Sequence, residues 1–95
     1  MRLSQQEIIN AICLNMAARK GLKPTDIEVE LMWDEDLGYS AKIYFQGREQ
    51  ILIEANMLEA IGQYVLNEYQ MRVFHNQIRL DIDDDLEEMV AEIAV

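Results

Sequence analysis

The sequence predicts an α+β fold of two layers, with the element order α-β-β-β-α-β-α and a four-stranded mixed sheet covered by helices on one face. Two kinds of pattern support this prediction. Apolar residues recur with a helical period of about 3.6 residues in three segments, and they alternate with polar residues in four others. Each predicted strand has one apolar face, so amphipathic helices can cover the whole sheet from a single side. At 95 residues, the chain is expected to form one domain, residues 1–95.

The first two helices are predicted from their start signals. Ser4 and Glu7 form the pattern of a capping box, which places the start of the first helix at Gln5. Gly21 suits the left-handed conformation in which helices often end. Asn56 occupies the capping position of the second helix. The apolar stripe of this second helix is wide, which indicates contact with both a sheet and a neighbouring helix.

A meander of three strands is predicted between these helices. Apolar and polar residues alternate at residues 27–33 and 39–45, on either side of a turn at residues 34–38. Residues 47–49 are predicted to form a three-residue hairpin loop, because the loop contains a glycine that can adopt positive φ. The third strand then ends with residues 51–53.

Two further elements are predicted after the second helix. Alternation at residues 78–82 predicts a fourth strand, which the preceding helix returns parallel to an earlier strand. This crossover makes the predicted sheet mixed. A last helix is predicted from a narrow apolar stripe, which consists of Leu86, Met89, Val90 and Ile93.

The composition limits the classes of partner. Eighteen acidic residues against eight basic ones give a formal net charge of −10. Such a surface repels phosphate backbones and anionic lipids, so neither a nucleic acid nor a membrane is expected as a partner. One cysteine cannot form an internal disulfide, and no apolar run has the length of a membrane span or follows a basic leader. We therefore expect a cytoplasmic protein.

A calcium-binding loop is one interpretation of residues 81–92, DIDDDLEEMVAE, because their carboxylates have the spacing of an EF-hand. Leu86 stands where such a loop requires glycine, and the preceding segment alternates like a strand. We therefore interpret these acidic residues as the start of the last helix, where the helix dipole favours negative charge. A weaker metal site remains open, because two acidic turns are expected at one end of the sheet. Its candidate ligands are Asp34, Asp36, Asp83 and Asp85.

No catalytic residue and no cofactor is predicted. His75 is expected in a turn, and no partner that could orient it lies nearby in the sequence. Cys13 lies at the edge of an apolar helical stripe, where a cysteine usually acts as a small apolar residue. The chain also lacks a glycine-rich phosphate loop, a CxxC pair and an HExxH motif. An enzyme is therefore not favoured.

The sheet face turned away from the helices is the predicted interaction face. Matching the apolar sides of the hairpins places Lys42 between Glu30 and Glu54. The apolar members of this face are Met32, Tyr44 and Leu52. Tyrosine and methionine are enriched at protein interfaces. The alternatives are homodimerisation, the docking of a protein partner, and a sheet face that is merely solvated.

The chain contains the stretches SQQEIINAICLNMA, DIEVELMWDEDLGYSAKIY and ILIEANMLEAI. Together they resemble a small family of uncharacterised proteins from Bacillus-type bacteria, catalogued as a domain of unknown function. This resemblance implies a bacterial cytoplasmic protein, and it implies no activity, cofactor or site residue. The order α-β-β-β-α is also similar to that of double-stranded-RNA-binding domains. The start of the second helix, EANMLEAIGQ, carries no lysine or arginine for phosphate contacts, which excludes that function.

The sequence therefore predicts a small acidic interaction or regulatory module that is not an enzyme. The alternative is an enzyme or a metal-dependent accessory protein that uses the acidic end of the sheet. The first function requires a protein partner, whereas the second requires a cation at the acidic turns.

Overall fold

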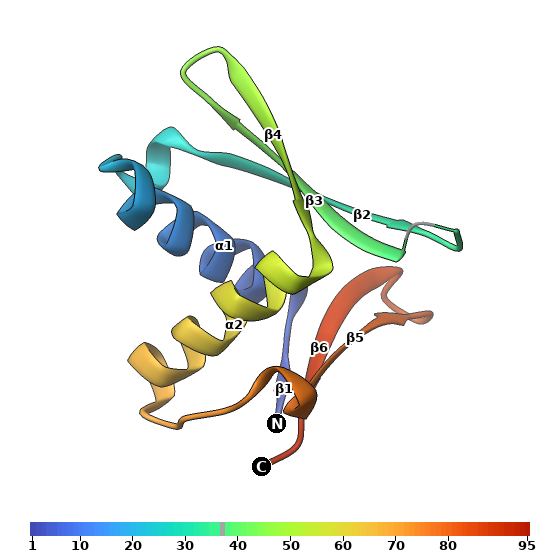
Figure 1. Ribbon diagram of the computed structural model, residues 1–95. Helices are drawn as coiled ribbons and strands as arrows, with labels where there is room; N and C mark the ends of the chain where they lie inside the picture. The colour runs from blue at the N-terminus through green and yellow to red at the C-terminus, as the bar shows by residue number, and fades with distance from the viewer. Residues whose placement is uncertain (37) are drawn as a thin grey trace.

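The computed structural model describes residues 1–36 and 38–95. Within them the chain forms two α-helices and six strands, so the fold is α+β (Figure 1). The helices are α1 (Gln5–Lys20) and α2 (Glu54–Tyr69), and two single turns of 3₁₀ helix are η1 (Pro24–Asp26) and η2 (His75–Gln77). The strands are β1 (Arg2–Leu3), β2 (Glu28–Asp34), β3 (Gly38–Phe45), β4 (Arg48–Ile53), β5 (Ile78–Asp83) and β6 (Glu88–Ile93).

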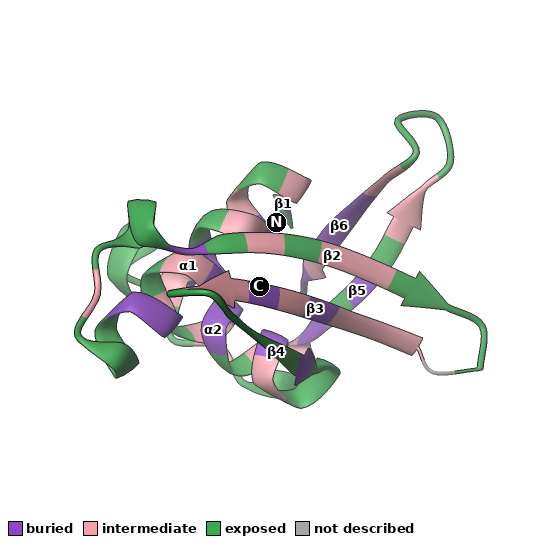
Figure 2. Ribbon diagram, turned by 90° about the horizontal axis from the view of Figure 1, so that it is seen from above, coloured by how far each residue is buried: buried purple, intermediate pink, exposed green. Residues whose placement is uncertain are grey.

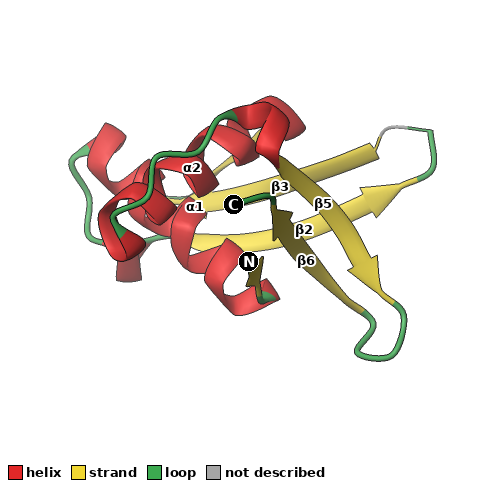
Figure 3. Ribbon diagram, turned by 90° about the horizontal axis from the view of Figure 1, so that it is seen from below, coloured by secondary structure: helices red, strands yellow, loops and turns green. Residues whose placement is uncertain are grey.

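The described strands form two separate antiparallel sheets rather than one mixed sheet. One sheet has the order β2-β3-β4, and the other has the order β1-β6-β5. Figure 3 shows β5 and β6 crossing β2 and β3 at a steep angle. The prediction of a four-stranded mixed sheet is therefore wrong, because β5 pairs with β6 and not with the meander.

The segment predicted as a last helix is the strand β6. Met89, Val90 and Ala91 are consecutive and all buried, which a helix covered on one side does not allow. β6 lies between β1 and β5, and a strand buried on both faces has a short continuous apolar run. The spacing within such a run cannot be distinguished from a helical stripe. Leu86, predicted as part of that stripe, is exposed in the turn before β6.

The outer side of β6 is covered by an arginine from β1. The guanidinium of Arg2 makes ion pairs with Glu92 at 2.6 Å and with Asp83 at 2.9 Å. Val90 lies between these two carboxylates on the same side of the sheet, and it is only 3% exposed. The side chain of Arg2 therefore crosses Val90 and shields it from water.

The two helices run antiparallel and pack against the inner faces of the two sheets. α1 contacts β2 and β6, whereas α2 contacts β3 and β4. Arg19 of α1 makes an ion pair with Glu59 of α2 at 2.6 Å. The predicted capping box is present, because Ser4 Oγ accepts a hydrogen bond from the backbone N–H of Glu7. The largest fully buried side chains are Leu3, Ile8, Ile12, Ile43, Met57, Ile61 and Val65.

Only one of the two predicted hairpin registers is confirmed. Glu30 lies opposite Lys42 in the first hairpin, as predicted. The second hairpin turns at residues 46–47, and Lys42 lies opposite Ile51 instead of Glu54. The register of β3 with β4 is therefore shifted by three positions from the predicted one. An odd shift moves every side chain of a strand to the other face of the sheet.

This shift corrects the placement of Leu52. Leu52 lies opposite Ala41 and is 5% exposed, so it belongs to the core and not to the interaction face. Ile51 and Ile53, which the predicted register would turn toward the helices, are on the outer side instead. Leu37, part of the predicted turn at residues 34–38, lies outside the described residues.

Candidate functional site

The outer side of the β2-β3-β4 sheet is covered by neither described helix. Figure 2 looks onto this side, with both helices behind the sheet. This surface is termed the open face. Its apolar members are Met32, Tyr44, Ile51 and Ile53, and its polar members are Glu28, Glu30, Asp34, Ser40, Lys42 and Glu49.

The apolar part of the open face lies where β4 runs into α2. Ile51 is 51% exposed and Ile53 is 62% exposed. Ser40 lies between Met32 and Ile53 in the sheet, so only a small side chain separates these two apolar residues. A hollow of about 410 Å³ adjoins Ile51 and Ile53, and it is lined by Tyr39, Ser40, Ile51, Ile53, Glu54 and Ala55. Exposed apolar side chains beside a hollow are typical of a binding surface.

The outer positions of Ile51 and Ile53 were not predicted from the sequence, because a three-residue loop was expected at residues 47–49. The signal that identifies them is the pair Gln46 and Gly47. Both residues have positive φ, 49° and 72°, as a two-residue type I′ turn requires. A two-residue turn at this position places Ile51 and Ile53 on the outer side.

The remaining part of the open face is acidic. Tyr44 Oη donates a hydrogen bond to Glu30 Oε2 at 3.1 Å. Partial loss of solvent, followed by this hydrogen bond, raises the pKa of Tyr44, so its phenol is protonated and acts as a donor at neutral pH. The open face carries four carboxylates against one ammonium, namely Glu28, Glu30, Asp34 and Glu49 against Lys42. Such a surface attracts cationic groups.

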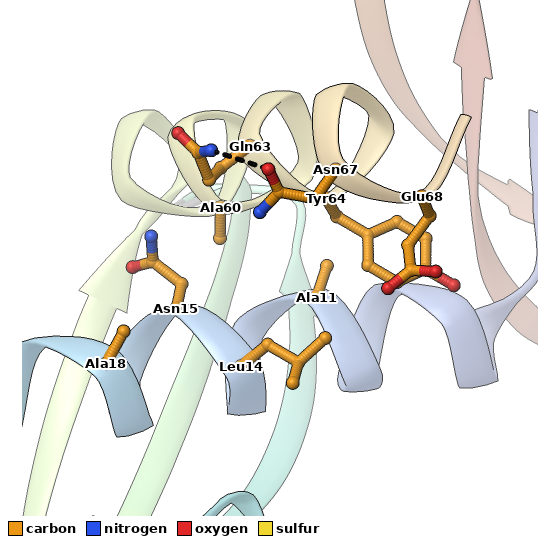
Figure 4. A pocket seen from close by; sticks show the side chains of 9 residues that line it. All are labelled: Ala11, Leu14, Asn15, Ala18, Ala60, Gln63, Tyr64, Asn67 and Glu68. Atoms are coloured by element: carbon orange, nitrogen blue, oxygen red, sulfur yellow. Dashed lines mark hydrogen bonds between the residues drawn. The ribbon is translucent and has the colours of Figure 1, made fainter. Parts of the chain in front are cut away.

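A second hollow, of about 290 Å³, lies between the exposed sides of α1 and α2 (Figure 4). Leu14 of α1 is 43% exposed there. On α2, Gln63 Nε2 donates a hydrogen bond to Asn67 Oδ1 at 3.2 Å. The lining residues are Ala11, Leu14, Asn15, Ala18, Ala60, Gln63, Tyr64, Asn67 and Glu68.

Two tyrosines of α2 share one carboxylate of α1. Tyr69 Oη donates a hydrogen bond to Glu7 Oε2 at 2.5 Å, and Tyr64 Oη donates to the same oxygen at 3.4 Å. The hydrogen bond to Glu7, followed by loss of solvent, raises the pKa of Tyr69 to about 12. The phenol of Tyr69 therefore stays protonated at neutral pH, and the cluster joins the two helices rather than exchanging protons.

The four candidate metal ligands belong to two separate hairpin turns. Asp34 Oδ1 accepts a hydrogen bond from the backbone N–H of Asp36 at 2.7 Å. Asp83 Oδ1 accepts one from the backbone N–H of Asp85 at 3.0 Å, and Asp83 Oδ2 is paired with Arg2. The residues predicted to start a helix thus stabilise a hairpin turn. In the described part of the chain, no group of three or more histidine, cysteine or carboxylate side chains could hold a metal ion.

His75 and Cys13 are not brought together. His75 is exposed in η2 and lines a hollow with Arg72, whereas Cys13 lines a different one. The thiol of Cys13 is half-buried and donates to the carbonyl oxygen of Ile27 at 3.7 Å. Burial raises the pKa of this thiol, so it is protonated at neutral pH and is a weak nucleophile.

Comparison with known proteins gives a family and no activity. The family model described as "Protein of unknown function (DUF2653)" matches residues 1–85. No curated protein and no solved structure matches the chain. The match agrees with the resemblance carried by the three sequence stretches, while the Bacillus-type origin stays a prediction. No helix of the described residues has the length and hydropathy needed to cross a membrane.

Proposed function

The chain belongs to this family of proteins of unknown function, and we propose that it is a binding module that docks a cationic protein partner on the open face. One observation carries the proposal. Ile51 and Ile53 are more than half exposed beside a hollow, on a surface rich in carboxylates. Apolar side chains that lose water on contact supply affinity, and complementary charges supply orientation and speed of association. The module needs no catalytic step of its own.

A cationic partner suits the open face better than a second copy of the chain does. Two open faces would repel each other, because each carries four carboxylates and one ammonium. Each whole chain also has a formal charge of −10. A partner with lysine or arginine among small apolar residues would instead pair its charges with the carboxylates.

We propose the cytoplasm as its location. Cys13 is the one cysteine of the chain, and it is a half-buried free thiol. A thiol of this kind suits a reducing compartment, where internal disulfides are not used for stability.

The test uses a short capped peptide that repeats lysine, threonine, valine and threonine. Lysine and valine share one side of this peptide when it is extended. The matched control peptide has glutamate in place of lysine. By fluorescence anisotropy, we expect the lysine peptide to bind and the glutamate peptide to bind at least about tenfold more weakly. Added salt should weaken the binding, because the charges of the open face are exposed.

Protein variants separate the open face from the rest of the surface. The double change Ile51→Ser and Ile53→Ser should weaken binding about thirtyfold, because each isoleucine loses apolar contact of order 1 kcal/mol. Leu14→Ser removes an exposed leucine from the hollow between the helices, and it should leave binding unchanged.

Two results would overturn the proposal: equal binding of both peptides, or equal losses in the Leu14→Ser variant and the double variant. Light scattering tests the other occupant of the open face. A dimer that dissociates after Ile51→Ser and Ile53→Ser would assign this surface to a second copy of the chain.

A further inference from the structure

We infer that the partner binds as an added β-strand along the free edge of β4 and so extends the β2-β3-β4 sheet. This inference rests on the proposed function and specifies how the partner is held. β4 is an edge of its sheet. A sheet edge presents a row of backbone N–H and C=O groups, and an extended segment of another chain can pair with them.

The turn before β4 determines which backbone groups point toward the edge. The turn at residues 46–47 has two residues with positive φ. The residues that flank such a turn, here Phe45 and Arg48, form a hydrogen-bonded pair. Hydrogen-bonded and non-hydrogen-bonded pairs then alternate along an antiparallel ladder. The backbone groups of Glu49 and Ile51 therefore point away from β3 and toward the free edge.

The end of β4 supports this alternation. The same rule directs the backbone N–H of Ile53 away from β3, and there it donates to Asn56 Oδ1 at 3.3 Å. The hydrogen bond to Asn56 closes the edge where α2 begins. The open part of the edge is therefore the backbone of Glu49 and Ile51.

Charge protects the other described edges more completely than it protects β4. The charged residues along those edges are Glu28, Glu30 and Asp34 on β2, Arg79, Asp81 and Asp83 on β5, and Arg2 on the two-residue β1. Charged side chains along an edge strand oppose pairing with another chain. β4 has charges at Arg48 and Glu49 only, and Ile51 and Ile53 leave its second half apolar.

The neighbours of the edge define the chemistry of the added strand. Side chains directly opposite each other on paired strands interact. A basic residue suits the position beside Glu49, and an apolar residue suits the position beside Ile51. The hollow of about 410 Å³ next to Ile53 accepts a further apolar side chain. The expected ligand is thus an extended segment of a partner protein with basic and apolar residues on one side.

Amide hydrogen exchange tests the strand directly. On addition of the lysine-threonine-valine-threonine peptide, we expect the exchange of the amides of Glu49 and Ile51 to slow at least about tenfold, because new hydrogen bonds protect them. The amide of Val29 is the control, since alternation across β3 directs it toward the opposite edge of the sheet. Its exchange should not change.

A proline variant gives a second, independent test. Ile51→Pro removes an N–H that points away from β3, so the pairing of β3 with β4 is kept. Ile51→Ala removes the same side chain but keeps the N–H. We expect the proline variant to bind the peptide at least about tenfold more weakly than the alanine variant, with thermal unfolding as the check on folding.

The outcomes separate the two proposals. If the peptide binds while Glu49 and Ile51 exchange as in the free protein, strand addition is wrong and docking on the open face stands. If the peptide does not bind the wild-type chain, the proposed function itself fails. Where the proline variant does not fold, the exchange measurement alone decides.

Discussion

On the outer side of the β1-β6-β5 sheet, Val90 is 3% exposed because Arg2 crosses it, whereas on the outer side of the β2-β3-β4 sheet Ile51 is 51% exposed. Both surfaces place apolar side chains among carboxylates, so their composition does not separate them. The difference is that a side chain of the same molecule covers one surface and not the other. An apolar residue on an outer sheet face is therefore available to a partner only where no side chain of the same chain shields it from water.

Val90→Asp should have the largest effect on this comparison. The change puts a carboxylate where water is excluded, and Asp81 lies directly opposite on β5. We expect the free energy of unfolding in urea to fall by about 3 kcal/mol or more. Ile51→Asp on the open face is the matched control and should cost no more than about 1 kcal/mol. Similar losses at both positions would mean that Val90 is not shielded.

Gly47→Ala should have an intermediate effect, and it tests the turn that creates the open face. Gly47 has φ of +72°, and a Cβ added there meets no atom within 4 Å. The cost therefore comes from the backbone conformation alone, and we expect a loss of about 1 kcal/mol in urea unfolding. Gln46→Asn should be neutral or stabilising, because asparagine tolerates positive φ. Equal losses from the two changes would contradict a type I′ turn at this position.

Asp83→Asn should have the smallest effect, and its difference from the wild type should be present at neutral pH and disappear in acid. The backbone N–H of Leu86, and secondarily Arg2, hold the pKa of Asp83 below its usual value of 3.8. A group whose pKa is lower in the folded state stabilises it above the unfolded pKa, and this contribution is lost as the pH falls through the folded pKa. We expect the thermal midpoint to decline below about pH 4 and this decline to be shallower in Asp83→Asn. Asp84→Asn, in the same turn, is the control. If Asp84→Asn makes the decline of the thermal midpoint as shallow as Asp83→Asn does, the hydrogen bonds and ion pair of Asp83 are not its cause.

Local signals predicted several parts of the fold that depend on neighbours in the sequence, although α2 begins at Glu54 and Asn56 lies within its first turn rather than at its cap. The capping residues Ser4 and Glu7 placed the start of α1 at Gln5, as observed. Alternation predicted the register of β2 with β3, and therefore the outer positions of Met32 and Tyr44. These features follow from hydrogen bonds and side-chain directions within a few residues, so the sequence contains the information needed.

The open face was predicted only in part, because one glycine is compatible with two different hairpin turns. Gly47 suits both a three-residue loop at 47–49 and the two-residue turn at 46–47 that forms. The three-residue loop predicted Leu52 on the surface and would turn Ile51 and Ile53 toward the helices. The two-residue turn reverses these positions, because side chains alternate along a strand. Nothing in the spacing of these apolar residues distinguishes the two registers.

The second sheet was not predicted, because it depends on segments far apart in the sequence. Leu3 pairs with Ala91, and Ala91 with Leu80, so β6 is recognisable as a strand only once its two neighbours are known. Viewed alone, its apolar residues fit a helix equally well. β1 has two residues, which is too short for any periodic signal.

The pairing of β1 with β6 also has a consequence for the order in which the molecule can assemble. Met1 and Ile93 exchange backbone hydrogen bonds of 2.9 and 2.7 Å across a separation of 92 positions. Joining such distant segments carries a loop-closure entropy that the adjacent strands of the meander largely avoid. Residues 28–53 are also synthesised before residues 88–93. The open face can therefore form on a growing chain while the other sheet still lacks its central strand.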